Sequence, residues 1–461
     1  MTITTPPHFV LFPFMSQGHT IPILHLSRML SDRHVSVTVI TNSATKSALF
    51  KNNFISVINI PFPDPPALQT NDKSPCMASF INYIKSTKQL QPEFEQLVRT
   101  LPPVTCIISD GFLIWTQDSA DKLGIPRLVF SGMNMFSSTM FNIMDNFNQH
   151  GEVRSINDPF PVPGFPRIKL TASHLEIGFK DDDPKSEGSD FVLRYQEATD
   201  RSYGMVVNSF YELEHEFNDY WNQNFVPKAW LVGPFCVAQP HAPMVEKPSW
   251  VHWLDKKLEA KEPVLYVSFG TQAEASEKEL LEVADGLEMS NISFIWVVKP
   301  KELTFISVGF RERVKGRGLL VGEWVDQVEI LNHEAVSGFL SHCGWNSVLE
   351  SLCAGVGILA MPLVAEQHLN AVMVVDEIGV GLRLWPRNMT TRGVVDSKEV
   401  AKMVVELMEG DSGKRVKKKV KEVKESAHCA MKEGGSSWQS LEMLIDNVYG
   451  VMHSKVKDNM F

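Results

Sequence analysis

The chain has 461 residues, which is more than one hydrophobic core usually serves and suits two domains. Its composition, with 44% hydrophobic and 21% charged residues, is typical of a soluble globular protein. The formal net charge of −10 gives no support to binding of nucleic acids or anionic membranes. Any anionic ligand must therefore be held by local groups.

The six cysteines are scattered and form no CxxC pair, so we expect free thiols in a reducing compartment. The first seven residues lack the basic-then-apolar pattern of a signal peptide. Residues 347–365 imitate a membrane span, but Gly355, Gly357 and Pro362 interrupt them, which favours a buried helix followed by a buried strand. We therefore expect a cytoplasmic monomer without membrane insertion.

The first half of the chain alternates strand and helix patterns. Residues 8–14 (HFVLFPF) and 35–41 (VSVTVIT) are apolar runs of strand length, and residues 21–30 between them have helical spacing. A third strand is predicted over residues 104–112 (VTCIISDGF) and a fourth over 127–132 (RLVFSG). This alternation predicts a doubly wound α/β sheet.

Two irregular stretches interrupt this half, at residues 61–75 and 158–189, and both are rich in Pro. Long loops over an α/β sheet often shape a ligand pocket. The second stretch contains Asp181, Asp182 and Asp183, which resemble a manganese-binding Asp-x-Asp. No strand leads into them, so a solvated acidic loop is the preferred interpretation.

The α/β pattern restarts after a proline-rich segment that spans residues 232–250. Residues 264–271 (VLYVSFGT) predict a strand, 277–290 an amphipathic helix and 294–299 (FIWVVK) another strand. The lysine-rich helix around residues 414–424 is predicted to present a solvated face. The predicted domains are an N-terminal acceptor-binding domain over 1–236, a linker over 237–249, a C-terminal domain over 250–440, and a final helix over 441–461 that packs back on the first domain.

The segment around His342 carries the most information about a ligand. Residues 336–342 (VSGFLSH) predict a strand, Gly344 allows close approach of the backbone, and Asn346 or Ser347 is a natural N-cap for the helix that follows. Glu350 lies three residues after Ser347, as in a capping box. A helix N-terminus at the carboxyl end of a strand is a ready anion site, most often used for phosphate.

Residues 324–367 resemble the signature box of plant secondary-product UDP-glycosyltransferases. The matching residues are Trp324, Gln327, His333, HCGWNS at 342–347, Glu350, AGV at 354–356, Pro362 and EQ at 366–367. The resemblance extends to SQGHTIP at 16–22, SDGF at 109–112 and VSFGT at 267–271.

The resemblance implies a GT-B fold, in which two Rossmann-like domains with parallel sheets face a central cleft. It implies that the C-terminal domain binds a UDP-sugar and the N-terminal domain a small acceptor, without a metal or other cofactor. For the nucleoside, the resemblance implies uracil stacking by Trp324, hydrogen bonding by the backbone of Val325, and ribose binding by Gln327 and Glu350. It implies diphosphate binding by Thr271, His342, Asn346 and Ser347, and sugar contacts by Trp345, Glu366 and Gln367. Gly344 is also expected in the donor-binding site.

Two positions depart from the family pattern. Val325-Asp326 stands where the family usually has Ala-Pro, and Gly357 stands where it usually has Pro. The contact implied for Val325 is made by its backbone, so we expect it to survive. Gly357 is expected to loosen the entry to the following strand.

The resemblance makes His19 the catalytic base and Asp110 its partner. The residues support the same interpretation, because both are predicted to end strands at the carboxyl edge of one sheet, where α/β proteins bind ligands. The start of the following helix disfavours a charged imidazole, and Asp110 could fix its tautomer. The alternative is a structural histidine. The implied reaction is inverting transfer of glucose from UDP-glucose, which gives a β-O-glucoside.

Other functions stay open at this point: an epimerase or hydrolase acting on sugar nucleotides, or a non-catalytic UDP-sugar-binding protein. A serine hydrolase has no GxSxG elbow to support it, and HWLD at 252–255 has the wrong spacing for an acyltransferase. Family habit favours a phenolic acceptor such as a flavonoid, with terpenoids and other phenols as alternatives. The apolar residues that could line its pocket are Phe12, Phe14, Met15, Met133, Met135, Phe136, Met140 and Phe141.

Overall fold

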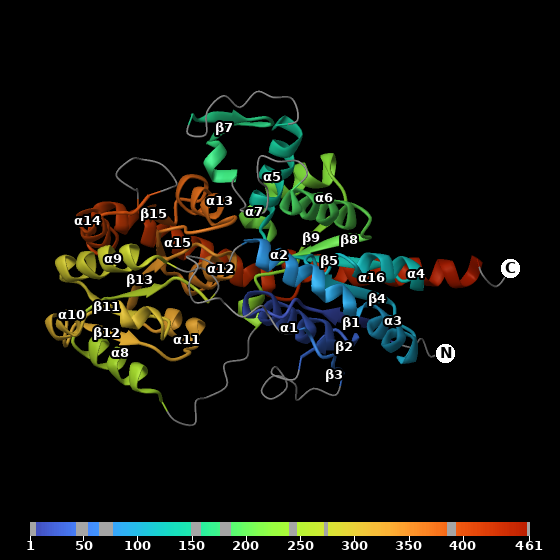
Figure 1. Cartoon of the computed structure of the whole chain (residues 1–461), viewed down its shortest axis with the longest axis horizontal. Coiled ribbons are helices and arrows are strands. Elements are labelled where there is room, and N and C mark those ends of the chain that lie inside the picture. Colours follow the sequence, from blue (N-terminus) through green and yellow to red (C-terminus); the bar gives the residue numbers. More distant parts are fainter. Residues whose placement is uncertain are drawn as a thin grey trace. The chain divides into compact units, whose positions relative to one another are not determined.

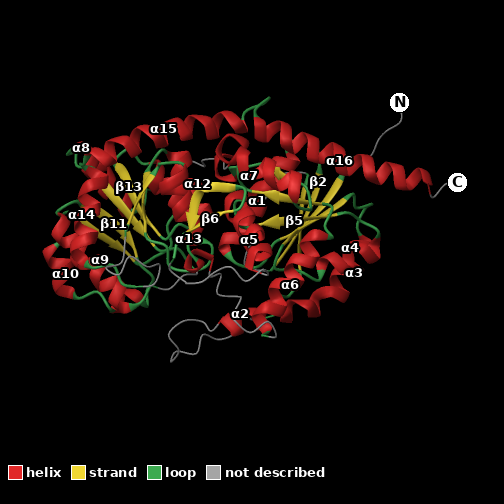
Figure 2. Cartoon of the chain, turned by 90° about the horizontal axis from the view of Figure 1, so that it is seen from above, coloured by secondary structure: helices red, strands yellow, loops and turns green. Residues whose placement is uncertain are grey.

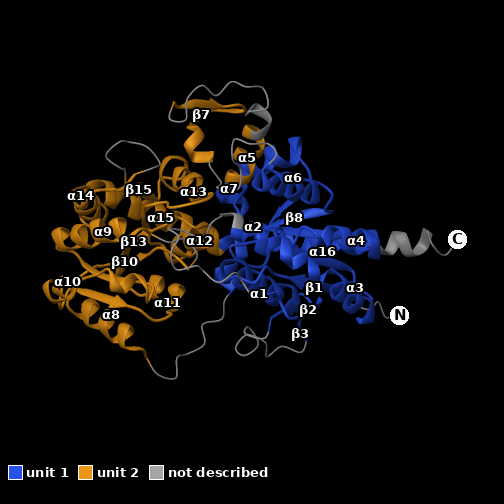
Figure 3. Cartoon of the chain, in the orientation of Figure 1, with its two compact units in different colours: residues 1–135, 178–239, 429–461 blue, residues 136–177, 240–428 orange. Residues whose placement is uncertain are grey.

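The computed structural model describes residues 6–42, 54–63, 77–148, 158–175, 186–238, 247–271, 275–384 and 393–458 (Figure 1). Two compact units are present, shown in blue and orange in Figure 3. Unit 1 comprises residues 1–135, 178–239 and 429–461, and unit 2 comprises residues 136–177 and 240–428.

Unit 1 is built on a parallel sheet with the strand order β3-β2-β1-β4-β5-β8-β9. Its strands are β1 (His8–Phe12), β2 (Ser36–Thr41), β3 (Ile55–Asn59), β4 (Cys106–Asp110), β5 (Arg127–Ser131), β8 (Gly204–Val207) and β9 (Ala229–Leu231). Its helices are α1 (Gln17–Ser31), α2 (Met77–Ser86), α3 (Gln91–Thr100), α4 (Thr116–Leu123), α6 (Glu187–Asp200), α7 (Tyr211–Asn224) and α16 (Ser436–Asp458).

The central strand β1 explains why this sheet is covered on both faces. Phe9 and Leu11 pack with apolar residues of α1 and α16, whereas Val10 and Phe12 pack with α2, α3 and α4. Alternate residues of a strand point to opposite faces, so an unbroken apolar run supplies both cores. Figure 2 shows helices on both sides of this sheet.

Unit 2 contains a second parallel sheet with the order β12-β11-β10-β13-β14-β15. Its strands are β10 (Val264–Ser268), β11 (Ser293–Val297), β12 (Gly318–Val321), β13 (Val336–Ser341), β14 (Gly357–Ala360) and β15 (Gly381–Arg383), with a separate hairpin of β6 (Phe160–Val162) and β7 (Phe165–Leu170). Its helices are α8 (Ser249–Glu259), α9 (Glu277–Ser290), α10 (Val308–Arg313), α11 (Gln327–Asn332), α12 (Trp345–Ala354), α13 (Gln367–Val372), α14 (Ser397–Met408), and most of α5 (Met135–Asn148) and α15 (Asp411–Met431).

The same alternation builds the core of unit 2. Leu265 and Val267 of β10 pack with α9 and α14, and Val264 and Tyr266 pack with α8 and α11. Among the residues that the structure describes, no helix combines the length and the apolar character that crossing a membrane requires.

The two units do not follow the predicted boundaries throughout. Unit 2 ends at residue 428, so residues 429–440, expected in the C-terminal domain, belong to unit 1. Residues 136–177 were expected in the N-terminal domain and cluster with unit 2. Leu441 and Leu444 of α16 lie in the core of unit 1, because the chain returns to that unit after α15.

Most local predictions agree with the structure. The predicted helix over 277–290 is α9, with a capping box between Ser276 and Glu279. Segment 347–365 contains the end of α12 and then strand β14, as expected. One boundary was wrong: α1 begins at Gln17, so His19 lies in the first turn of a helix and not at the end of a strand.

Candidate active site

His19 and Asp110 meet at the carboxyl edge of the sheet of unit 1. Asp110 is the last residue of β4, which pairs with β1, and His19 follows β1 in the first turn of α1. Nδ1 of His19 lies 2.7 Å from Oδ2 of Asp110. The other carboxylate oxygen accepts a hydrogen bond of 2.9 Å from the backbone N–H of Phe112. Both Asp110 oxygens are thereby engaged, and its carboxylate is held in one orientation.

This contact determines which nitrogen of His19 can act as a base. With Asp110 ionised, the proton on the neutral imidazole resides on Nδ1, and Nε2 carries the lone pair. The ring packs against Phe14 and Phe112, with ring centroids 5.7 and 5.0 Å away. The side chain still retains 16% of its accessible surface, so the imidazole is oriented but reachable.

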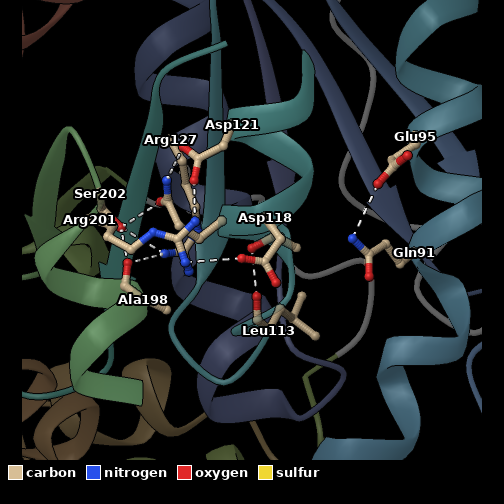
Figure 4. Close-up of polar contacts among 11 residues, drawn as sticks. Gln91, Glu95, Leu113, Asp118, Asp121, Arg127, Ala198, Arg201 and Ser202 are labelled. Carbon is tan, nitrogen blue, oxygen red and sulfur yellow. Dashed lines mark hydrogen bonds and ion pairs between the residues drawn. The ribbon is translucent and has the colours of Figure 1, made fainter. Parts of the chain in front are cut away.

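Arg127, which the sequence analysis did not single out, supports the end of β4 from within the sheet. It is 1% exposed, and its guanidinium donates to Ser109 Oγ at 2.6 Å. It also donates to Ser202 Oγ at 2.8 Å (Figure 4). A weaker bond of 3.3 Å reaches the carbonyl oxygen of Asp110. Burial lowers the pKa of Arg127 to about 10, so it remains charged at neutral pH. In the sequence, Arg127 could have been recognised as a single charged residue at the start of an apolar strand.

A cavity of about 570 Å³ lies in unit 1, close to His19. Its lining is largely apolar, includes four aromatic rings and carries no formal charge: Phe14, Met15, Ser16, Asn42, Asn59, Ile60, Pro61, Phe62, Pro63, Phe80 and Tyr83. Phe14 connects the two features, because its ring lines the cavity and also contacts His19. The volume falls in the range of small-molecule pockets.

Of the eight apolar residues expected to line a pocket, Phe14 and Met15 do so. Phe12, Met135, Phe136 and Met140 are fully buried and serve the core. Met133 and Phe141 are partly buried and do not line this cavity. Pro61, Phe62 and Pro63 do line it, as expected for the start of that proline-rich stretch, while residues 64–75 lie outside the described residues.

In unit 2, His342 lies where β10 and its neighbour β13 end. A β-carbon at either Gly270 or Gly344 would lie 2.6 Å from Nε2 of His342, so two glycines make room for the ring. Gly270 also has a φ of +74°, which favours glycine. Burial lowers the pKa of His342 to about 4, and the charge of Lys299 acts in the same direction. His342 is therefore neutral at pH 7 and can offer a hydrogen bond, not a positive charge.

The start of α12 differs from the prediction. Gly344 is the N-cap and the helix begins at Trp345, so the expected capping by Asn346 or Ser347, with Glu350 in a capping box, is wrong. The N-cap residue has no side chain, which leaves the N–H groups of the first turn without a side-chain cap. Such an end is suited to an anion.

Three of the predicted site residues form one hydrogen-bonded cluster. The side-chain amide of Gln327 donates to Ser347 Oγ at 2.9 Å and to Glu350 Oε2 at 2.6 Å, and accepts from the Tyr266 hydroxyl at 2.9 Å. Burial raises the pKa of Glu350 to about 7, and nearby Asp326 adds to the shift, although the bond from Gln327 opposes it. This carboxyl therefore changes charge near neutral pH.

Both departures from the family pattern have local explanations. Asp326 is the N-cap of α11 and accepts from the N–H groups of Val328 and Glu329 at 3.0 and 3.3 Å. A β-carbon at Gly357 would lie 2.6 Å from Val416 of α15. Gly357 thus allows close packing of helix on strand, and the expectation of a loosened strand entry is not supported.

The remaining predicted donor residues are spread over three segments of unit 2. Trp324 is 70% exposed, whereas the following Val325 is buried. Thr271 is exposed at the end of a described segment. Gln367 is 7% exposed, and its side-chain oxygen accepts from the N–H groups of Leu363 and Val364 at 3.0 Å.

At the start of the helices, Trp345 is buried and Asn346 is partly buried in the first turn of α12, and Glu366 is the N-cap of α13. Asp181, Asp182 and Asp183 lie outside the described residues. Elsewhere in the described part of the chain, no three His, Cys, Asp or Glu side chains gather as a metal site would require.

Glu350→Gln is expected to change how the stability of the protein depends on pH. In the folded protein the pKa of Glu350 is about 7, above its ordinary value of 4.5. Between these values the folded protein binds the proton more tightly than the unfolded chain does, so the contribution of Glu350 to stability falls as pH rises. The variant lacks this titration. Relative to wild type it should gain on the order of 1 kcal/mol in unfolding free energy between pH 5 and pH 8. Denaturant unfolding measures the difference.

The matched control is Glu259→Gln, the same change at an exposed position of unit 2. Its unfolding free energy should depend on pH as that of wild type does across this range. If the unfolding free energy of Glu350→Gln also followed the wild-type dependence on pH, the Glu350 carboxyl would not titrate near neutrality in the folded protein.

Comparisons with known proteins agree with these features. Residues 220–413 match the family described as UDP-glucoronosyl and UDP-glucosyl transferase. The chain is 44% identical to UDP-glycosyltransferase 90A1 of Arabidopsis thaliana, with 95% of each chain covered. It is 34% identical to UDP-glucose flavonoid 3-O-glucosyltransferase 7 of Fragaria ananassa, again with 95% of each covered.

Among solved structures, Phytolacca americana UGT2 in complex with UDP-2-fluoroglucose and pterostilbene matches with a TM-score of 0.79 and 29% identity, over 96% of this chain and 99% of that one. The GT-B fold predicted from the sequence is confirmed by this likeness. The chain therefore belongs to the plant UDP-glycosyltransferases, enzymes that transfer a sugar from a UDP-sugar to a small acceptor.

Proposed function

We propose that this enzyme transfers glucose from UDP-glucose to a hydroxyl of a small, largely apolar acceptor, with inversion to a β-O-glucoside. The observation that carries the proposal is the contact between His19 Nδ1 and Asp110 Oδ2 beside an aromatic cavity of unit 1. A non-catalytic sugar-nucleotide-binding protein would have no need of this oriented, partly exposed imidazole. A phenol such as a flavonoid is the proposed acceptor, and a terpenoid is the alternative.

In the proposed mechanism His19 is the general base. Nε2 removes the proton of the acceptor hydroxyl as its oxygen attacks the anomeric carbon of the sugar. Asp110 keeps the ring in the required tautomer and stabilises the imidazolium that forms, as in other His–Asp pairs. Attack from the face opposite the diphosphate converts an α-linked donor into a β-product.

The donor would be held by unit 2. Trp324 would stack on the uracil with its exposed ring, the backbone of Val325 would bond to the base, and the Gln327–Glu350 pair would bind the ribose hydroxyls. Thr271, which follows β10, would surround the diphosphate together with neutral His342 and with Gly344, Asn346 and Ser347 at the start of α12. Because these donors are dipoles aimed at a buried anion, they can stabilise the leaving UDP without a cation.

The nature of the acceptor is supported by the lining of the cavity and by relatives. Aromatic, uncharged walls suit a neutral phenol. The Fragaria ananassa relative is named for a flavonoid, and the Phytolacca americana structure holds pterostilbene. We also propose that the enzyme is cytoplasmic, since Cys106, Cys343, Cys353 and Cys429 are free thiols, and that it acts as a monomer.

His19→Ala is expected to lower transfer by roughly 10²–10⁴-fold, the usual worth of a positioned general base. Asp110→Asn should also lower it, because the amide cannot hold the same tautomer. UDP affinity, measured by calorimetry, should stay within about twofold, since UDP would bind to unit 2. The control His215→Ala, at an exposed histidine of α7, should behave as wild type. Loss of UDP binding together with activity would identify His19 as structural.

Transfer is expected to continue in excess EDTA. The N–H groups of α12 and His342 would replace a divalent cation at the diphosphate, so the rate of glucoside formation should change by less than about twofold. Product is measured by liquid chromatography with and without the chelator. Activity that disappears and returns with Mn²⁺ would contradict metal independence and direct attention to Asp181–Asp183.

Glucose is expected to be preferred over galactose when the two UDP-sugars compete at equal concentration. The two sugars differ at the 4-hydroxyl, and one hydrogen bond to it is worth about 0.5–1.5 kcal/mol, or up to about 3 with a charge such as Glu366. This supports a preference of a few-fold to about a hundredfold. Equal amounts of the two products would remove Gln367 as the residue that distinguishes the sugars.

Two variants separate the roles of Gln367 in this competition. Gln367→Ala should reduce glucose transfer more than UDP affinity. Gln367→Glu keeps an oxygen for the N–H groups of Leu363 and Val364 but removes the amide N–H donors. If the amide N–H donors of Gln367 contact the sugar, both variants should lose the preference for glucose over galactose. If Gln367→Ala alone loses it, the effect comes from the loop of Leu363 and Val364.

A further inference from the structure

Two residues that line the cavity in unit 1 each carry a buried polar atom that calls for a partner. Ser16 and Asn59 both line the cavity. The hydroxyl oxygen of Ser16 and Oδ1 of Asn59 are buried, and neither has a hydrogen-bond partner among the described residues. Native proteins pair nearly all such atoms, so two of them on residues that line the same cavity call for a ligand or water.

The backbone explains why both atoms are available. Ser16 is the N-cap of α1, a position where a serine hydroxyl usually accepts from the first turn, but here it makes no capping bond. The N–H of His19 bonds instead to the carbonyl oxygen of Ser16, at 3.1 Å. Asn59 is the last residue of β3, opposite Thr41 at the end of β2. Both residues therefore lie at the carboxyl edge of the sheet, as Asp110 does.

The rest of the cavity wall limits what can bind there. Phe14 contacts Phe80 and Tyr83 edge to face, with centroids 5.9 and 5.6 Å away, which provides surfaces for a flat ring. No lining residue is formally charged, so an ionised ligand would lose its hydration without a partner. Phe14 also contacts His19, so a ring in the cavity lies near the proposed base.

We propose that Asn59 and Ser16 form a polar subsite that selects neutral aromatic acceptors with a second hydroxyl group. The proposal rests on the proposed function, in which the first hydroxyl is the one glucosylated at His19. Oδ1 of Asn59 only accepts hydrogen bonds, so the ligand must supply an O–H donor, whereas Ser16 Oγ can donate or accept. The second hydroxyl bonds to Asn59 and is not glucosylated in that orientation.

The test uses pairs of probes that differ in this donor alone. One pair is 4,4′-dihydroxystilbene and 4-hydroxy-4′-methoxystilbene, and a shorter pair is 4,4′-dihydroxybiphenyl and its monomethyl ether. Each ether retains one hydroxyl for transfer and the oxygen at the far end, but it cannot donate there. For at least one pair, kcat/KM for the diol, halved for its two equivalent hydroxyls, should exceed that for the ether about tenfold, because the ether leaves Asn59 unpaired.

Asn59→Leu replaces the amide by an apolar group of similar size. The ratio of the halved kcat/KM for the diol to the kcat/KM for the ether should then be close to one. Asn447→Leu makes the same change at an exposed position of α16 and should keep the tenfold ratio. Ser16→Ala is the second variant if Asn59→Leu fails to fold, and it should lower the ratio several-fold. Near-ultraviolet circular dichroism and UDP affinity check folding.

The outcomes separate this proposal from the proposed function. Equal rates for diol and ether in both pairs, or a preference that Asn59→Leu and Ser16→Ala retain, would overturn the polar subsite while leaving glucosyl transfer intact. Such a result would mean that water satisfies Ser16 and Asn59. No transfer to any of the four probes by an enzyme that still binds UDP would count against the phenolic acceptor itself, and the subsite would fall with it.

Discussion

Parallel pairing of strands distant in sequence is the constraint on which both halves of the candidate site depend. β1 pairs directly with β4, so the segments that follow these strands leave the sheet side by side. This brings His19 and Asp110, 91 residues apart, within 2.7 Å. In unit 2, β10 pairs with β13, and the glycines after the two strands enclose His342. In each unit the chemistry lies at the carboxyl edge of the sheet, where α/β folds place ligands.

The two units also share a second property: their charged groups near these edges are few, and neighbouring polar groups compensate their charges. Unit 2 presents a neutral His342, an uncapped helix start at α12 and a Glu350 whose pKa is raised to about 7. Because a chain with a net charge of −10 repels anions at long range, an anion bound at this edge would be attracted by short-range dipoles. In unit 1 the buried charge of Arg127 is spread over hydroxyl and carbonyl acceptors next to Asp110.

The departures from the family pattern show how local compensation preserves a site. Asp326 takes the place of a helix-starting proline by capping α11 with its own carboxylate, which keeps Gln327 at the first position of the helix and within reach of Glu350. Gly357 gives up side-chain packing in β14 and admits Val416 at short distance. In both cases the change is accommodated locally, because the Asp326 carboxylate bonds to backbone N–H groups of α11 and Gly357 leaves room for Val416.

The sequence by itself determined the local elements and the family of the protein. Alternating apolar strands and capped amphipathic helices predicted β1, β4, β10 and α9, because these signals depend on neighbours along the chain. The signature segment identified the family for the same reason. The sequence also indicated that His19 and Asp110 would share one edge, since parallel strands end together.

Only the tertiary structure decided which groups meet and which remain unused. Gln327 joins Ser347 and Glu350 in one cluster, α12 starts at Trp345 without a side-chain cap, and residues 429–440 belong to unit 1. The cavity takes most of its lining from the ends of β2 and β3 and from α2, which no local pattern links to His19. Such contacts depend on packing between distant segments of the chain. A periodic pattern in the sequence predicts that a face is buried, but it does not predict which residues pack against that face.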